Sequence, residues 1–190
     1  MKENTRQKLI DATYEEVYSK GYQGASLKDI LQNAKVHKGS MYHYFANKKE
    51  MALAAIDEKI SQRFDTRYGR ILELDSNYID EFFKGVKDLS NRDFNRGCPV
   101  ANIIQEMSNI DDDFRITMNS IYKKFKDNLE KILDKSIQKK EIKQCDKKKI
   151  ALYITSTLEG AILSAKASGE AQDYIDTIEL LEEHINTLKI

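Results

Sequence analysis

The fold of the N-terminal part of this chain is decided by residues 26–50, which read SLKDILQNAKVHKGSMYHYFANKKE. Ser26 is followed three positions later by Asp29, a capping-box-like helix start with Asp in the place of the usual Glu or Gln. We expect a short helix over Leu27–Ala34, then a four-residue link. A second short helix is expected near Gly39–Phe45. This spacing is typical of the helical pair of a helix-turn-helix.

Further helices are expected on both sides of this pair. Residues 5–20 carry apolar side chains at helical spacing, and Gly21 follows as a stop signal. Asn47 can cap a longer helix that runs to about Leu74. A helix, a tight helical pair and a long helix in this order predict a tri-helical helix-turn-helix. Its second short helix is the one that enters the major groove of DNA.

The rest of the chain has helical periodicity and no strand alternation of any length. Apolar residues step by three or four positions from Phe114 to Ile132, and again from Tyr174 to Leu188. One Pro and eight Gly in 190 residues also favour helices. We therefore predict an all-α fold of about nine helices, with a DNA-binding domain over residues 1–48 and a helical regulatory and dimerisation domain over residues 49–190.

The formal net charge of zero conceals an uneven distribution. From Lys20 to Lys49 there are six lysines and one acidic residue, a net charge of +5. From Asp146 to Ile190 there are five lysines and eight acidic residues, a net charge of −3. A basic N-terminal patch on a neutral protein is typical of a DNA-binding module attached to a body that does not bind DNA. A charged face that only meets solvent is the alternative.

Several classes of protein do not fit this sequence. The two cysteines make no disulfide framework, and no charged-then-apolar leader opens the chain. The most apolar stretch, Ile150–Ala165, contains Glu159 and is too short to span a bilayer. We expect a cytoplasmic protein. The three histidines, His37, His43 and His184, are scattered, and no metal-ligand cluster, nucleophile elbow or phosphate-binding loop is present. We expect no enzyme, metal or cofactor.

The second short helix and its neighbours supply the candidate DNA contacts. Small side chains permit close approach to the duplex, tyrosines can donate to phosphates, and lysines at helix starts attract phosphate. The candidates are Ser26, Lys28, Lys38, Gly39, Ser40, Tyr42, His43, Tyr44 and Lys48. Packing in a small three-helix core is the alternative role for the tyrosines, and we favour that role for Phe45.

These residues together resemble the tetracycline-repressor (TetR) family. The resemblance rests on Ser26–Ile30, Ala34–Phe45 and Asn47–Glu50, with Gly21-Tyr22 upstream. The family usually has Gly where this chain has Lys35, in a turn that needs positive φ, so we expect strain or a slightly altered turn there. The resemblance implies that the hydroxyl of Tyr42 lies on a DNA phosphate.

The resemblance also implies a homodimer through the last two helices and a ligand pocket in the helical body. The stripe from Tyr174 to Leu188 fits a partner helix, and Gly160, Ala161, Ser164 and Ala165 allow close helix approach; packing within one monomer is the alternative. Met and aromatic side chains make adaptable pockets, although each is also a plausible core residue. The ligand candidates are Phe82, Phe83, Val86, Cys98, Met107, Met118, Tyr122 and Phe125.

The resulting hypothesis is a DNA-binding regulator, a repressor that a small-molecule or reactive inducer releases from operator DNA. Cys98 lies just before a predicted helix N-terminus, where a thiol has a lowered pKa and can react with electrophiles or oxidants. A buried, inert Cys98 is the alternative. A second hypothesis is a protein of the same fold that has no small ligand and is controlled by a protein partner.

Overall fold

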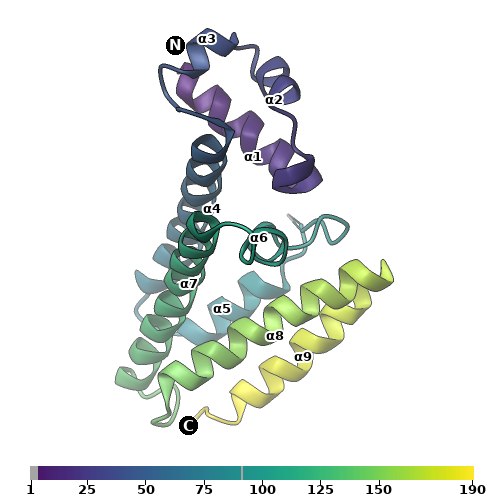
Figure 1. Ribbon diagram of the computed structural model, residues 1–190. Coiled ribbons are helices and arrows are strands. Elements are labelled where there is room, and N and C mark those ends of the chain that lie inside the picture. Colours follow the sequence, from purple (N-terminus) through teal and green to yellow (C-terminus); the bar gives the residue numbers. More distant parts are fainter. Residues whose placement is uncertain (1–3, 91) are drawn as a thin grey trace. The chain divides into compact units, whose positions relative to one another are not determined.

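A computed structural model describes residues 4–90 and 92–190, and every described secondary-structure element is a helix. The nine described helices are α1 (Thr5–Gly24), α2 (Leu27–Ala34), α3 (Lys38–Met41), α4 (Lys48–Leu72), α5 (Tyr78–Lys87), α6 (Pro99–Met107), α7 (Asp112–Gln138), α8 (Lys147–Ser168) and α9 (Ala171–Asn186) (Figure 1). The predicted all-α fold of about nine helices is confirmed. None of the described helices is long and apolar enough to cross a membrane.

Two helix boundaries differ from the sequence-based expectation. Gly21 does not end the first helix but kinks it, with φ 74° and ψ 171° inside α1. The helix expected near Gly39–Phe45 ends at Met41, after which the chain continues as turns. In these turns the backbone N–H groups of Tyr44 and Phe45 both donate to the carbonyl oxygen of Met41, at 2.9 and 3.0 Å. The α2 bounds agree with the prediction.

The chain divides into two compact units. The first comprises residues up to Ser61 together with Pro99–Ile121, and the second comprises Gln62–Cys98 together with Tyr122–Ile190. Helices α4 and α7 each contribute their first part to the first unit and the remainder to the second. The predicted division of roles between residues 1–48 and 49–190 stays a prediction.

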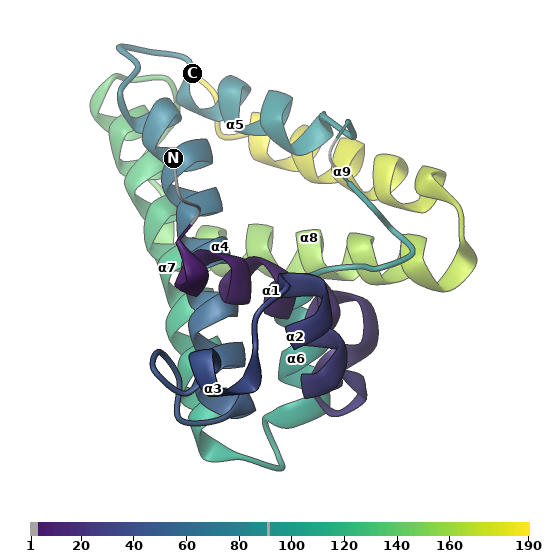
Figure 2. The same ribbon diagram turned by 90° about the horizontal axis from the view of Figure 1, so that it is seen from above.

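The first unit has a core built from the apolar faces of short helices. Each of α1, α2 and α3 contributes side chains that are almost fully buried, and the mid-chain segment adds more. Figure 2 shows α6 lying against α1. Through these two helices the mid-chain part of this unit contacts its N-terminal part. The buried apolar residues include Leu9, Ile10, Val17, Ile30, Met41, Phe45, Met51, Ile103, Met107, Phe114 and Met118.

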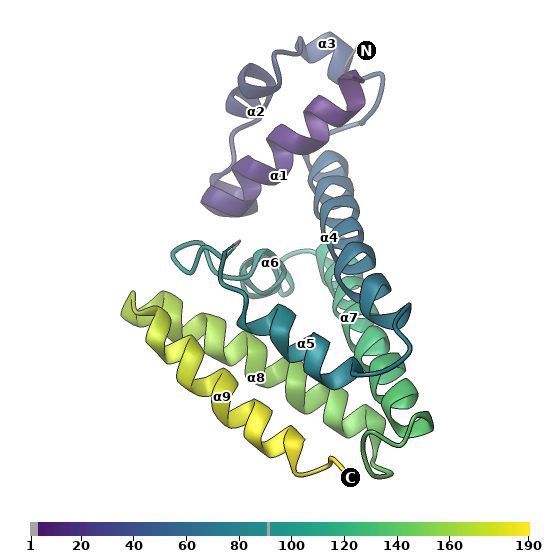
Figure 3. The same ribbon diagram turned by 180° about the vertical axis from the view of Figure 1, so that it is seen from behind.

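The second unit is a helical bundle with an aromatic centre. Figure 3 shows α8 and α9 running side by side, with α5 next to them. Tyr68 stacks on Phe82 and Phe125, with ring centroids 6.4 and 5.5 Å apart. The stripe expected along the last helix is buried in this core, as Tyr174, Ile178, Leu181 and Ile185. The prediction that this stripe faces a second copy was therefore wrong, because α9 uses it against its own unit.

Candidate nucleic-acid interface

The helix-turn-helix is shaped by one side-chain cap and one left-handed residue. The Ser26 hydroxyl accepts from the backbone N–H of Asp29 at 3.4 Å and so begins α2. Lys35 ends α2 in the left-handed region, with φ 55° and ψ 42°. A positive φ was expected here, because the family usually has Gly at this position. The N–H of Val36 then returns to the carbonyl of Leu31 at 3.0 Å. This closed turn sets the direction in which α3 leaves α2.

The structure exposes most of the candidate DNA contacts on and after α3. Met41 and Phe45 are buried and anchor this segment, which confirms the core role of Phe45. Between these anchors, Tyr42 is 52% and Tyr44 43% exposed. The other exposed candidates are Lys28, Lys38, Gly39 and His43, whereas Ser26, Ser40 and Lys48 are half-buried.

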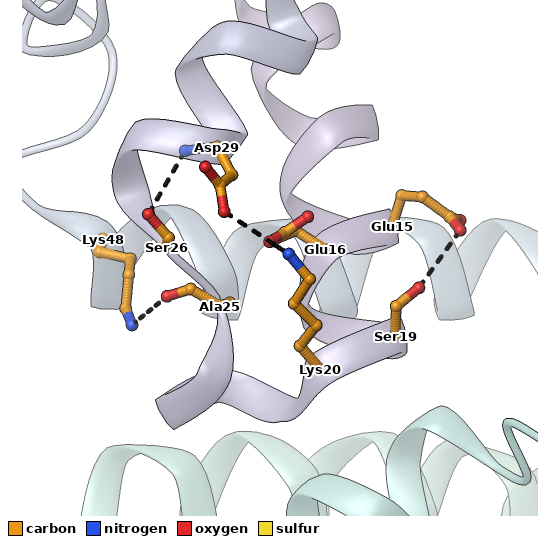
Figure 4. A network of polar contacts seen from close by, with 8 residues as sticks. All are labelled: Glu15, Glu16, Ser19, Lys20, Ala25, Ser26, Asp29 and Lys48. Atoms are coloured by element: carbon orange, nitrogen blue, oxygen red, sulfur yellow. Dashed lines mark hydrogen bonds and ion pairs between the residues drawn. The ribbon is translucent and has the colours of Figure 1, made fainter.

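Folding neutralises part of the basic patch that the sequence predicted. The Lys20 ammonium lies 2.6 Å from a Glu16 carboxylate oxygen and 3.5 Å from one of Asp29, a contact that bridges α1 and α2 (Figure 4). The Lys49 ammonium lies 2.7 Å from Asp111 and 2.6 Å from Asp113, which raises the pKa of Lys49 above its ordinary value. These two lysines are already paired with carboxylates.

The remaining lysines of this region divide into two kinds. Lys28, Lys35 and Lys38 are exposed, and in the described part of the chain no carboxylate lies within ion-pair distance of them. Lys48 is half-buried, and its ammonium donates to the carbonyl oxygens of Tyr22 at 2.8 Å and Ala25 at 2.9 Å. Burial lowers the pKa of Lys48. The structure thus gives Lys48 an internal role, and its contact with DNA stays a prediction.

The eight candidate ligand residues do not fall in one unit. Met107 and Met118 belong to the core of the first unit, where they are 3% and 0% exposed. In the second unit, four of the candidates are buried and two are half-buried. The buried residues are Phe82, Phe83, Val86 and Phe125, and the half-buried ones are Cys98 and Tyr122.

Cys98 and Tyr122 lie near a carboxylate that the sequence analysis did not select. Glu159 on α8 accepts a hydrogen bond from Cys98, and its Oε2 atom is buried with no hydrogen-bond partner among the described residues. Burial raises the pKa of Glu159, while the bond from Cys98 and the charge of Arg92 act in the opposite direction. Burial, with the Glu159 charge as a smaller cause, raises the pKa of Tyr122 to about 12.

Arg92 is a second half-buried charged residue that sequence reasoning missed. Its guanidinium lies over the Tyr174 ring at 4.6 Å, and its Nη2 donates to the Val86 carbonyl at 3.0 Å. Its Nε is buried and has no hydrogen-bond partner within residues 4–90 and 92–190, and burial lowers the pKa of the side chain. Glu159 could have been noticed as a charged residue within an apolar helical stretch. Arg92 lies in a loop, where no hydrophobic pattern marks it.

The C-terminal helices leave apolar side chains on the surface of the second unit. Leu152 and Leu163 of α8 are 50% and 54% exposed, and Leu180 of α9 is 67% exposed. On α8 the small residues separate into two faces, because Ala161 and Ala165 are buried while Gly160 and Ser164 are exposed. Among the residues that the structure describes, no heavy atom outside the local helix lies within 4 Å of a Cβ placed on Gly160. The exposed surface of α8 and α9 therefore combines leucines with small residues.

Comparison with known proteins agrees with this geometry. Residues 9–55 match the family model of bacterial regulatory proteins of the tetR family, and residues 76–181 match the model of the tetracyclin repressor-like C-terminal domain. An uncharacterised HTH-type transcriptional regulator of Lactococcus lactis is 34% identical over 134 residues, which cover 66% of this chain and 68% of the relative. The transcriptional regulator AcuR of Cereibacter sphaeroides is 36% identical over 123 residues, covering 59% of this chain and 53% of that protein.

A solved structure extends the similarity over nearly the whole chain. A TetR-family transcriptional regulator from Cytophaga hutchinsonii superposes with a TM-score of 0.86 and is 28% identical. The match covers 98% of this chain and 95% of that one.

Proposed function

The chain belongs to the tetracycline-repressor family of bacterial transcriptional regulators, and from this premise we propose that it is a homodimeric repressor released from operator DNA by a small-molecule inducer. The observation that carries the DNA-binding part is the exposed group Lys28, Lys38, Tyr42, His43 and Tyr44, held by buried anchors. Lysines attract phosphates, and tyrosines and histidine can donate to phosphates or base edges. We propose a cytoplasmic location, because a regulator must reach operator DNA.

The proposed dimer forms through α8 and α9. The uncovered leucines of these helices are the kind of side chain that an obligate interface buries, and the exposed Gly160 and Ser164 permit close helix approach. A two-fold dimer presents two recognition segments, as an operator with two half-sites requires. Binding of the inducer would favour a state in which the two segments no longer match the half-site spacing.

The proposed inducer site lies in the second unit around Cys98, Tyr122, Glu159 and Arg92. Buried polar atoms normally have hydrogen-bond partners, so an orphan donor on Arg92 and an orphan acceptor on Glu159 favour a polar ligand that supplies both. These atoms favour the small-molecule hypothesis over control by a protein partner alone. The core side chains Phe82, Phe83, Val86 and Phe125 would form the apolar surroundings.

A reactive inducer is a second candidate, and the hydrogen bond between Cys98 and Glu159 is the observation that favours it. The carboxylate could accept the thiol proton as the sulfur adds to an electrophilic carbon. Cys98→Ser tests this version through operator release by a quinone. Release that is unchanged in the serine variant would contradict it, whereas release that is lost would support it.

The function itself is tested by selecting DNA duplexes from a randomised library with the purified chain. We expect enrichment of a two-fold symmetric sequence, bound with nanomolar affinity that falls steeply with salt. Tyr42→Phe removes only a hydroxyl from a half-exposed side chain, so it should weaken operator binding several-fold without changing thermal unfolding. A wild-type chain that enriches no sequence, or that binds all duplexes equally, would contradict the proposal.

A further inference from the structure

A carboxylate that accepts two hydrogen bonds joins α6 to the end of α1 in the first unit. Both carboxylate oxygens of Glu106 accept from backbone N–H groups, one from Tyr22 at 2.9 Å and the other from Gln23 at 2.8 Å. The kink at Gly21 restarts the helix and leaves these two N–H groups without the acceptors that an unbroken helix would supply. A Cβ placed on Gly21 would lie 2.6 Å from Glu106 Oε2, so a larger residue there would displace the carboxylate and would also be strained at φ 74°.

Residues 22–25, the end of α1 and the residue after it, are called the α1–α2 loop here, and Lys48 holds the opposite side of this loop. Its ammonium donates to the carbonyl oxygens of Tyr22 and Ala25 and lies 4.3 Å from the centre of the Tyr22 ring. The Tyr22 ring also packs against Phe114, with centroids 4.5 Å apart. The loop between α1 and α2 is therefore bound through its N–H groups by a carboxylate and through its carbonyls by an ammonium.

This loop leads directly into the DNA-binding helices. Ala25 is 3% exposed, and the next residue is Ser26, whose hydroxyl begins α2. The position at which α2 starts, and with it the turn at Lys35 and the segment after it, depends on where residues 22–25 are held. Charge-assisted hydrogen bonds of this kind are among the stronger polar contacts in proteins.

We propose that Glu106 is a positioning residue for operator recognition, which holds the α1–α2 loop and thereby the recognition segment in a DNA-competent position. This inference rests on the proposed DNA-binding function. It assigns the mid-chain segment Pro99–Ile121 an indirect part in DNA recognition, in which none of its residues needs to touch DNA. A change in α6 that withdrew the carboxylate would release the loop.

The test compares Glu106→Gln with Glu141→Gln, a control of the same chemistry in the other unit. Glu141 also accepts with both oxygens from two successive backbone N–H groups, those of Asn77 and Tyr78. In glutamine an amide NH2 group replaces one of the two carboxylate oxygens, and this group cannot accept from the second N–H. Affinities are measured by fluorescence anisotropy for a duplex selected by the wild-type chain and for a scrambled duplex of the same length.

We expect Glu106→Gln to lower the ratio of selected to scrambled affinity about tenfold, while Glu141→Gln leaves it unchanged. Both variants are expected to lower the thermal midpoint, so the ratio separates positioning from stability. Equal ratios for Glu106→Gln and the wild type would overturn the proposal. A wild-type chain with no preference for the selected duplex would instead contradict the proposed function.

A second measurement keeps the proposal testable if Glu106→Gln does not fold. Glu106→Ala frees both N–H groups, and added formate is a carboxylate small enough to occupy them. We expect formate to restore part of the affinity ratio in this variant and to leave the wild type unchanged. A folded Glu106→Ala variant whose ratio does not respond to formate would overturn the proposal.

Discussion

The salt dependence of operator binding should distinguish the lysines that folding leaves available from those that it neutralises. We compare Lys38→Ala with Lys49→Ala. Lys38 is exposed, and no carboxylate lies within ion-pair distance of it among the described residues, whereas Lys49 is paired with Asp111 and Asp113. From sequence alone the two lysines contribute equally to the basic patch.

The expected magnitude follows from counterion release. Each lysine that neutralises a DNA phosphate contributes about 0.9 to the slope of log affinity against log salt, so one substitution in a dimer removes about 1.8. When the salt concentration rises fourfold, the factor by which operator affinity falls should therefore be about twelve times smaller for Lys38→Ala than for the wild type. Lys49→Ala should leave the slope within about 0.3 of the wild type, because its charge is already compensated by two carboxylates.

The assay is anisotropy titration of a selected duplex at four or more salt concentrations between about 50 and 200 mM, where screening is moderate. Circular dichroism at each salt concentration verifies that both variants stay folded. Lys28→Ala is a second exposed lysine and should behave like Lys38→Ala. An equal loss of slope in Lys38→Ala and Lys49→Ala would refute the reasoning, since it would show that the intramolecular ion pairs do not hold Lys49 away from DNA.

Three further predictions concern stability, assembly and pH. Lys35→Gly should raise the free energy of unfolding by about 1 kcal/mol, because a left-handed backbone costs a residue with a Cβ about that much. An unchanged free energy of unfolding in urea would contradict this. Leu180→Glu should convert the dimer to monomers in analytical ultracentrifugation. Ile116 is an exposed apolar residue of the first unit, and Ile116→Glu should leave the dimer intact. A dimeric Leu180→Glu variant would argue against an interface at α9. The raised pKa of Glu159 means that the folded state binds its proton more tightly than the unfolded state, so stability falls as pH rises from the ordinary glutamate pKa to the raised one. Glu159→Gln should remove this fall, and parallel stability curves for variant and wild type across that range would count against a raised pKa of Glu159.

Much of the local structure was predictable because its causes lie within a few residues of one another. The Ser26 cap, the bounds of α2 and the positive φ at Lys35 all depend on short-range hydrogen bonds and on whether a residue has a Cβ. The same reasoning failed at Gly21. The kink there continues as a further helical turn because Glu106, more than eighty positions away, supplies acceptors for the freed N–H groups.

The apolar stripe of α9 shows a second limit of sequence reasoning. Periodicity from Tyr174 onward correctly predicted an amphipathic helix, but it did not tell which surface the helix would cover. The tertiary structure places this stripe in the second unit's own core and leaves Leu180 exposed on the other side. A hydrophobic pattern specifies that a face is buried, and it carries no information on whether the covering side chains belong to the same chain.

The residues 26–50 by themselves determined the helical pair, its turn and its family, because capping, turn geometry and helical period act over distances that a short segment contains. Only the tertiary structure decided what the charges of that segment do. Lys49 meets two carboxylates of the mid-chain segment, Lys48 meets backbone carbonyls, and Lys28 and Lys38 remain exposed. The reason is that electrostatic energy depends on distance in space, and acidic residues remote in the sequence are brought close only when the chain folds.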